Sequence, residues 1–274
     1  MNWTVSLPMY NVTPRLQREY EALLATLLVD AGVRDEAQLL REPELPALWR
    51  RPDLLVGQTC GYPYVSFLRG VTTLLATPCF DFPGCDGSNY ASVIVTRAVD
   101  GVKSLAEARG LTAAVNDQHS NSGMNVLRHA AAPLARDGRF FGRVKWTGSH
   151  VASLRAVREE EADIAAIDCV TFGYLRGELP DIIQGIKILQ YSASSPGLPL
   201  ITAHSVPDEV RLHLRRALLS PSPRLREHMT AVRIKAFQHR PDADYNRIAQ
   251  LESEAVAAGY PALFSGDRAV MPPS

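Results

Sequence analysis

The sequence predicts an α/β fold, and three observations lead to this class. Segments typical of buried strands alternate with segments whose apolar residues recur at helical spacing, from one end of the chain to the other. The length of 274 residues fits one large α/β domain or two lobes. With 46% hydrophobic and 21% charged residues, the composition is that of an ordinary globular protein. Such an alternation favours mostly parallel sheets covered by helices on both faces.

The first third of the chain predicts a strand, a long helix and two further strands. Residues 4–7 form the first strand, and Thr13 caps a helix that has proline at its first position and ends at Gly32. The apolar face of this helix comprises Leu16, Tyr20, Leu23, Leu24, Leu27 and Leu28. Residues 54–56 and 71–76 are expected to be buried strands, followed by a loop rich in proline and glycine.

The middle of the chain repeats a strand, a polar turn and a helix. The expected strands are residues 92–96, 112–115, 144–146, 164–167 and 186–191, with helices between most of them. A last strand at 200–202 leads into three expected helices, 207–219, 225–237 and 243–258. The whole order is that of an α/β protein with a helical carboxyl-terminal third.

The charge balance argues against nucleic acid as a partner. The chain has 29 Lys and Arg against 29 Asp and Glu, and its formal net charge is +0. Nucleic-acid binders gain affinity by neutralising phosphates with clustered basic side chains, which this sequence lacks. Dinucleotide and P-loop fingerprints are absent from the sequence, and the 7 histidines show no metal-ligand spacing. We therefore expect no metal and no cofactor.

The amino-terminal sequence and the cysteines bear on the compartment. The segment MNWTVSLPMYN has neither the basic region nor the apolar core of a secretory signal, and no apolar run approaches the roughly 20 residues that cross a bilayer. The four cysteines contain no C-x-x-C pair, which favours a reduced state, although a Cys79–Cys85 disulfide stays open. As written, the sequence predicts a cytoplasmic protein without a transmembrane segment. The alternative is a periplasmic protein whose leader is missing from this sequence.

Polar clusters follow five of the expected strands, at the ends where α/β sheets bind ligands. They are Met9-Tyr10-Asn11, Gln58-Thr59-Cys60-Gly61-Tyr62, Ser120-Asn121-Ser122-Gly123, Thr147-Gly148-Ser149-His150 and Asp168. One such cluster would carry little weight, but five at the same strand ends indicate a site between two lobes.

The turn at residues 120–123 has two interpretations. Its short hydroxyl and amide side chains can cap the following helix, or they can surround a bound anion together with the first backbone N–H groups. A second such turn at residues 147–150 favours the anion, because two converging turns supply many donors without Lys or Arg. His150, with an ordinary pKa near 6.5, adds a donor and, at lower pH, a positive charge. Asp168 either caps the helix after it or accepts a proton from a protonated oxyanion or a ligand amine.

Together these motifs resemble the phosphate, phosphite and phosphonate substrate-binding proteins of ABC transporters, which have the type II periplasmic-binding-protein fold. The matching pieces are Tyr90 to Val95, Ser120 to Gly123, Thr147 to His150 and Glu161 to Asp168, and the resemblance is best over residues 90–175. It implies two α/β lobes with mostly parallel sheets and flanking helices, joined by two crossing strands. Lobe 1 would comprise residues 1–91 plus 197–274 and lobe 2 residues 92–196, with the ligand in the cleft between them.

The resemblance also implies a role for each candidate residue. Ser120, Asn121, Ser122 and His150 would hold the oxyanion beside Thr147 and Ser149, Tyr10, Tyr62 and Tyr90 would form the wall that closes over it, and Asp168 would select the substituent or the protonation state. The middle hydroxyl of the family is often Thr, whereas this chain offers an amide donor there. We therefore expect a monomer that binds a small oxyanion by hinge closure, without chemistry, and serves an ABC permease or a regulatory partner.

The alternative is a cytosolic enzyme on the same fold that acts on a small anionic metabolite. Cys60, His150 and Asp168 could serve as nucleophile, base and orienting acid. The segment Gly57-Gln58-Thr59-Cys60-Gly61 is not a nucleophile elbow, however, because the thiol stands one place late. A buried structural cysteine is the favoured interpretation of Cys60.

Overall fold

The computed structural model describes residues 3–263, and the chain folds into two compact units. Within the described residues, unit 1 comprises 3–90 together with Ser195–Asn246, and unit 2 comprises Ala91–Ser194 together with 247–263. Residues 247–263 thus belong to unit 2, whereas the sequence-based division placed them in lobe 1. Residues 1–2 and 264–274 of the expected lobes lie outside the described residues.

Unit 1 is built on a six-stranded sheet. The strand order is β14 (Ile234–Gln238), β4 (Thr72–Phe80), β13 (Leu200–Ala203), β3 (Leu54–Gln58), β1 (Trp3–Ser6) and β2 (Ala37–Leu39). Strands β1, β2, β3 and β4 run in one direction, and β13 and β14 run in the other. A small second sheet in this unit joins β5 (Cys85–Asp86), β6 (Asn89–Tyr90) and β12 (Ser195–Pro196). The chain re-enters unit 1 through β12 and then β13, which lies antiparallel between β3 and β4.

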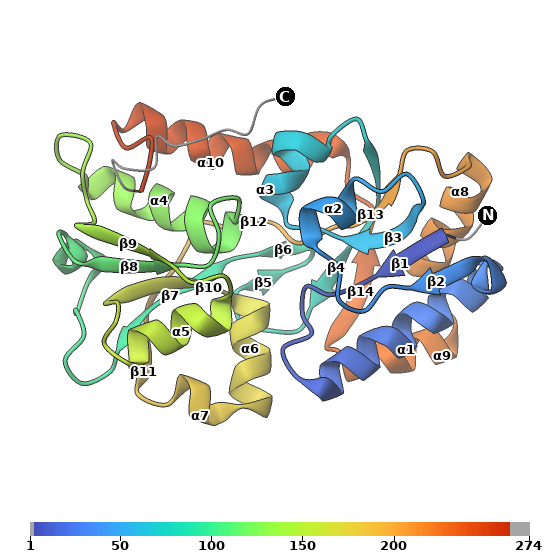
Figure 1. The fold of residues 1–274 in the computed structure, drawn as a ribbon, viewed down its shortest axis with the longest axis horizontal. Helices are drawn as coiled ribbons and strands as arrows, with labels where there is room; N and C mark the ends of the chain where they lie inside the picture. The colour runs from blue at the N-terminus through green and yellow to red at the C-terminus, as the bar shows by residue number, and fades with distance from the viewer. Residues whose placement is uncertain (1–2, 264–274) are drawn as a thin grey trace. The chain divides into compact units, whose positions relative to one another are not determined.

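The helices of unit 1 pack against this sheet and one another. Helix α1 (Pro14–Asp30) lies beside α9 (Pro223–Ala231), and α8 (Asp208–Leu219) contacts β4 (Figure 1). The expected cap of α1 is present, because the Thr13 hydroxyl accepts a hydrogen bond from the backbone N–H of Leu16 at 3.2 Å. The remaining helical segments are α2 (Leu45–Trp49), α3 (Gly61–Pro63), a π-helical turn at Tyr64–Leu68 and 3₁₀ turns at Arg34–Glu36 and Asp242–Tyr245. The two cysteines flagged for a disulfide lie in β4 and β5, and the structure holds no bond between them.

One predicted helix is wrong. The apolar spacing of residues 225–237 predicted a single helix, whereas α9 ends at Ala231 and β14 begins at Ile234. Between them, Arg233 has a φ of 59°, in the left-handed region that cannot continue a right-handed helix. The residues after Arg233 pair antiparallel with β4 instead. Hydrogen bonding to a sheet edge therefore outweighs the local helical pattern.

Unit 2 holds a five-stranded sheet. The strand order is β11 (Ile186–Tyr191), β7 (Ser92–Arg97), β10 (Ile164–Asp168), β8 (Thr112–Val115) and β9 (Arg143–Trp146). Strand β7, on which the chain enters this unit, is antiparallel to β10 and β11, while β8, β9 and β10 are parallel. The carboxyl ends of β8, β9 and β10 therefore meet at one edge of the sheet. The predicted α/β class is confirmed, and both large sheets are mixed, with parallel and antiparallel neighbours.

The helices of unit 2 include the last helix of the chain. They are α4 (Val126–Ala131), α5 (His150–Arg158), α6 (Cys169–Glu178), α7 (Pro180–Ile183) and α10 (Asn246–Ala257), with a π-helical turn at Asn121–Asn125 and 3₁₀ turns at Leu105–Ala108 and Ala132–Leu134. Helix α10, red in Figure 1, lies alongside the green α4, and His129 of α4 pairs with Glu254 of α10 at 2.7 Å. Across residues 3–263, no helix combines the length and apolar character that a membrane span requires.

Candidate functional site

The two candidate turns of unit 2 come together in the structure. Ser122 Oγ and His150 Nε2 form a hydrogen bond of 2.9 Å, although the two residues are 28 positions apart. Their turns follow β8 and β9, which are neighbouring parallel strands, so both emerge at the same edge of the sheet. The topology therefore places hydroxyl, amide and imidazole groups in one small region.

The turn after β8 is buried and closely hydrogen-bonded. Ser120, Asn121 and Ser122 are 5%, 0% and 4% exposed. The Ser120 hydroxyl oxygen accepts from the backbone N–H of Gly123 at 2.9 Å, which is the capping interpretation of this turn. A serine that accepts one hydrogen bond still carries a proton to donate. Capping and anion binding are therefore compatible at Ser120.

Asn116 holds the two turns side by side. A Cβ added to Gly123 would lie 1.7 Å from Oδ1 of Asn116, so only glycine fits there without a shift of Asn116. The backbone carbonyl of Asn116 accepts from the N–H of Gly148, in the second turn, at 3.0 Å. Asn116 was not among the sequence-based candidates, although its place directly after β8 was a signal.

The turn after β9 is more exposed than the turn after β8. The hydroxyl groups of its own residues form most of the side-chain hydrogen bonds that hold it. Thr147 Oγ1 lies 2.6 Å from Ser153 Oγ and 3.2 Å from the carbonyl oxygen of Val115. The Ser149 hydroxyl oxygen accepts from the backbone N–H of Ala152 at 3.1 Å and so caps α5. These bonds make Thr147 and Ser149 parts of the turn and the cap. Contact of either with a ligand stays a prediction.

His150 is a neutral group in this structure. Its Nδ1 is buried and, within the described part of the chain, makes no hydrogen bond of ordinary geometry. Burial lowers the pKa of His150 to about 4, and the backbone of Ala166 opposes this shift only in part. A positive charge on His150 is therefore expected only at a pH well below 6.5, and its contact with a ligand stays a prediction. A neutral imidazole can still orient Ser122 by a hydrogen bond.

Asp168, at the end of β10, caps the next helix. Its Oδ1 accepts from the backbone N–H groups of Val170 at 2.7 Å and Thr171 at 3.0 Å, and the residue is 2% exposed. Its partner across the sheet is Ser92 of β7, whose hydroxyl is buried without a hydrogen-bond partner in residues 3–263. The capping interpretation of Asp168 is thus present in the structure, and its role as a selector stays a prediction.

The three candidate tyrosines belong to unit 1. Tyr10 is 2% exposed and packs in an aromatic cluster, with ring centroids 6.4 Å from Tyr20 and 5.3 Å from Phe80. Tyr90 is buried in β6, and Tyr62 is half-buried in α3. The aromatic cluster accounts for Tyr10 by core packing. The part of these tyrosines in ligand binding stays a prediction.

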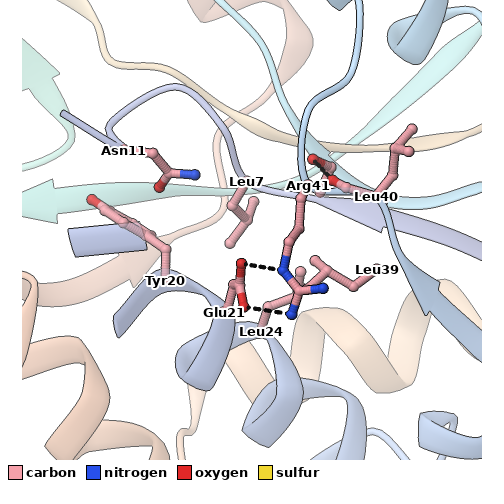
Figure 2. A pocket seen from close by; sticks show the side chains of 9 residues that line it. Leu7, Asn11, Tyr20, Glu21, Leu24, Leu39, Leu40 and Arg41 are labelled. Carbon is pink, nitrogen blue, oxygen red and sulfur yellow. Dashed lines mark hydrogen bonds and ion pairs between the residues drawn. The ribbon is translucent and has the colours of Figure 1, made fainter. Parts of the chain in front are cut away.

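Two hollows in unit 1 do not match the expected chemistry. The smaller one follows β1, and Figure 2 shows its lining, in which Arg41 donates to both carboxylate oxygens of Glu21 at 3.0 Å. Its volume of about 10 Å³ leaves room for about one water molecule. The larger hollow, of about 520 Å³, contains Arg240, which is engaged by Asp244 at 3.1 Å and by Asn89 at 2.6 Å. The guanidinium groups of Arg41 and Arg240 thus already pair with acidic side chains, so neither hollow has the chemistry expected of an anion site.

Two buried residues behind the first turn were missed by the sequence analysis. Asn125 and Arg128 are 0% and 4% exposed. They stand four and seven positions after Asn121, so all three lie along one side of the π-helical turn and α4. The helical spacing of these three polar residues is the signal that could have found them.

Comparison with known proteins identifies one matching protein family. The profile of a family described as an ABC transporter, phosphonate, periplasmic substrate-binding protein matches residues 13–245. Among curated protein sequences, none matches significantly.

Several solved structures share the fold. One is the binding-protein component of an ABC phosphonate transporter from Pseudomonas aeruginosa, at 18% identity and a TM-score of 0.77, covering 93% of this chain and 87% of that one. PhnD1 from Prochlorococcus marinus, in complex with methylphosphonate, has 14% identity and a TM-score of 0.76, covering 92% and 97%. A Xanthomonas citri protein bound to ATP has 16% identity and a TM-score of 0.68, covering 93% and 98%.

These findings decide the fold and the broad class of function. The fold is that of the type II periplasmic binding proteins, as expected. Members of the matching family are substrate-binding components of transporters, so the enzyme alternative built on Cys60, His150 and Asp168 is not supported. Such a component implies a small ligand and a permease partner. The chain belongs to the phosphonate-binding family of periplasmic substrate-binding proteins of ABC transporters.

Proposed function

We propose that this protein binds a small phosphorus oxyanion of the phosphonate type and delivers it to an ABC permease. The observation that carries the proposal is the Ser122–His150 hydrogen bond, because it joins the two turns that resemble oxyanion-binding motifs. PhnD1, which has a similar fold, was solved with methylphosphonate, and this makes methylphosphonate the first ligand to test.

The donors of unit 2 suit an anion without a basic side chain beside it. When neutral His150 donates its Nε2–H to Ser122 Oγ, the hydroxyl proton of Ser122 is available for a ligand oxygen. Ser120 can donate in the same way, since capping uses only a lone pair of its oxygen. Hydrogen bonds to a charged group contribute about 1.5–3 kcal/mol each. Four or five of them could offset desolvation and give roughly micromolar affinity, about −8 kcal/mol.

The other candidates have distinct parts in this proposal. Thr147 and Ser149 shape the turn that carries His150, and the Ser149 hydroxyl, whose oxygen accepts in the cap of α5, can still donate its proton. The carboxylate of Asp168 disfavours a fully ionised ligand nearby and favours one that brings a proton or an amine. Tyr10, Tyr62 and Tyr90 complete the site from unit 1 when the two units close over the ligand. The tyrosine assignment rests on the resemblance alone.

A ligand panel tests the proposal. Thermal shift and calorimetry with phosphate, phosphite, methylphosphonate, 2-aminoethylphosphonate and sulfate should show stabilisation by at least one phosphorus oxyanion. Ser122→Ala should then weaken binding about tenfold or more, because one hydrogen bond to the anion is lost. The matched control is Ser253→Ala, since the Ser253 hydroxyl on α10 donates to the carbonyl of Ala249 at 3.1 Å. A panel without any stabilisation at millimolar concentration would reject the phosphorus-oxyanion ligand.

We further propose that the protein works as a monomer in the periplasm, where the family description places its members. Fractionation of cells that express the natural gene tests the compartment, and recovery in the cytosol would favour the cytoplasmic alternative. Light scattering after gel filtration, with and without methylphosphonate, tests the monomer. A stable dimer under both conditions would contradict it.

A further inference from the structure

Behind the first turn of unit 2, three buried polar residues form a chain of hydrogen bonds. Arg128 Nη2 donates to Asn125 Oδ1 at 2.7 Å, and Asn125 Nδ2 donates to Asn121 Oδ1 at 3.0 Å. All three residues are 4% exposed or less. Water therefore has little access to these groups, and the protein itself must satisfy them.

Arg128 sets the direction of this chain. A guanidinium group only donates hydrogen bonds, so the atom of Asn125 that faces it is the amide oxygen. The NH₂ group of Asn125 then faces Asn121, and the atom of Asn121 that accepts from it is again the amide oxygen. Asn121 consequently turns its own NH₂ group away from Asn125.

The end of the chain holds Arg128 in place. Arg128 Nη1 donates to the carbonyl oxygen of Pro261 at 3.0 Å, and Nη2 pairs with Glu252 of α10 at 3.2 Å. Asn125 also donates to the carbonyl oxygen of Ile248, on the same helix, at 3.0 Å. A buried guanidinium is strongly destabilising without partners, so these contacts fix its position. Helix α10, red in Figure 1, thus contacts the turn through Asn125 and contacts α4 through Arg128.

We propose that Arg128 is a positioning residue for the anion site: through Asn125 it orients Asn121 so that the amide NH₂, rather than the amide oxygen, faces the ligand. The inference rests on the proposed function, because it takes Asn121 to contact an oxyanion. It gives α10 a part in ligand binding, since α10 holds the arginine. It also explains how an asparagine can stand where the family often has a hydroxyl residue.

The orientation has a consequence for the protonation state of the ligand. An NH₂ group at Asn121 favours an ionised ligand oxygen, whereas an amide oxygen there favours a P–OH group. Methylphosphonate changes from monoanion to dianion near neutral pH, so it reports on this preference. His150 stays neutral above about pH 6 because its pKa lies near 4. Of the other charged groups packed around the turn, Asp168 is the same in wild type and variants, whereas Glu252 loses its ion-pair partner in Arg128→Gln. The Asn121→Thr background separates this change of charge from the orientation of the amide, because an effect of charge alone would persist there.

Calorimetry with methylphosphonate at about pH 6 and about pH 8.5 tests the proposal. Arg128→Gln, whose amide can donate or accept, should lower affinity about tenfold at the higher pH and less at the lower pH. Arg128→Lys, which can only donate, should restore part of the wild-type preference. In Asn121→Thr, a hydroxyl can rotate to donate without help, so adding Arg128→Gln should not change the pH preference further. An Arg128→Gln variant with the wild-type ratio of the two affinities would overturn the proposal.

His129→Gln is the matched control. His129 is the next residue on α4, and its Nε2 pairs with Glu254 of α10 at 2.7 Å, but it has no place in the chain of bonds to Asn121. This variant should keep the wild-type affinity and the wild-type pH preference. A change as large as that of Arg128→Gln would show that general loosening of α10 is the cause, which contradicts the proposal.

A measurement on the wild-type protein separates this inference from the proposed function. Neutron diffraction distinguishes the nitrogen and oxygen of each asparagine amide, with or without a ligand. Because it uses the wild-type protein, it does not depend on whether a variant folds. The proposal expects the oxygen of Asn121 to face Asn125, and the opposite orientation overturns it. If wild-type protein binds no member of the oxyanion panel, the proposed function fails, whichever orientation is seen.

Discussion

The two turns of unit 2 look alike in sequence but are held in different ways. The turn at residues 120–123 is buried, and the direction of its central amide is set by Arg128 and α10. The turn at residues 147–150 is more exposed, and its hydroxyls bond mainly within their own strand, turn and helix. The side chains of a short polar motif at the end of a strand can therefore be held by hydrogen bonds within the motif and its neighbours, or by residues far away in the sequence. Substitutions should reveal the difference.

Gly123→Ala should have the largest effect on stability. The added Cβ would meet Oδ1 of Asn116 at 1.7 Å and Ser120 Oγ at 3.3 Å, so the side chain of Asn116 must move. The backbone carbonyl of the same residue bonds to the second turn, so a shift of Asn116 disturbs both turns. We expect the free energy of unfolding in urea to fall by about 2–3 kcal/mol.

Gly148→Ala is the matched substitution in the second turn. Gly148 has a φ of 83°, and a Cβ there would have no atom within 4 Å. Only the left-handed backbone opposes alanine, which costs about 1 kcal/mol. Equal losses for the two glycines would contradict the difference between the turns.

The pH dependence of stability tests the buried setting of His150. Because its pKa is about 4 in the folded protein and about 6.5 when unfolded, the unfolded chain binds the proton first as pH falls. Stability should therefore be lost between about pH 6.5 and pH 4, on the order of 1 kcal/mol by pH 5.5. His150→Gln should remove this part of the slope in denaturation curves, while the same change at the exposed His204 should leave it. A slope that His150→Gln does not alter would argue against the buried neutral imidazole.

The smallest effect is expected at Ser149, one of the two serines that cap the helical segments after the turns. Ser120→Ala should cost about 1–2 kcal/mol because its cap is buried, and Ser149→Ala about 0.5–1 kcal/mol because its cap is exposed. Thermal unfolding measures both, with Ser222→Ala as a reference, since Ser222 caps α9 of unit 1 by accepting from Leu225 at 3.1 Å. If Ser149→Ala proves the more damaging of the two, burial is not what distinguishes the turns.

Local patterns were enough to predict most elements and the place of the candidate turns. The cap of α1 at Thr13 and the strand before Asp168 depend on residues close in sequence, and both are present. The strand β14 was missed because its partner, β4, lies far away in the sequence. Arg128 and Asn125 were missed for a similar reason, since their importance comes from contacts with α10.

The sequence by itself determined the α/β class, the polar turns that end β8 and β9, and a resemblance that the family match bears out, because these depend on periodicity and on short motifs. Only the tertiary structure decided that Ser122 meets His150, that desolvation lowers the pKa of His150, and that an arginine directs the amide of Asn121. The physical reason is that the burial of a side chain and the direction of its hydrogen bonds depend on the residues that surround it in the folded protein. For this turn, the surroundings are supplied by a strand and a helix far along the chain.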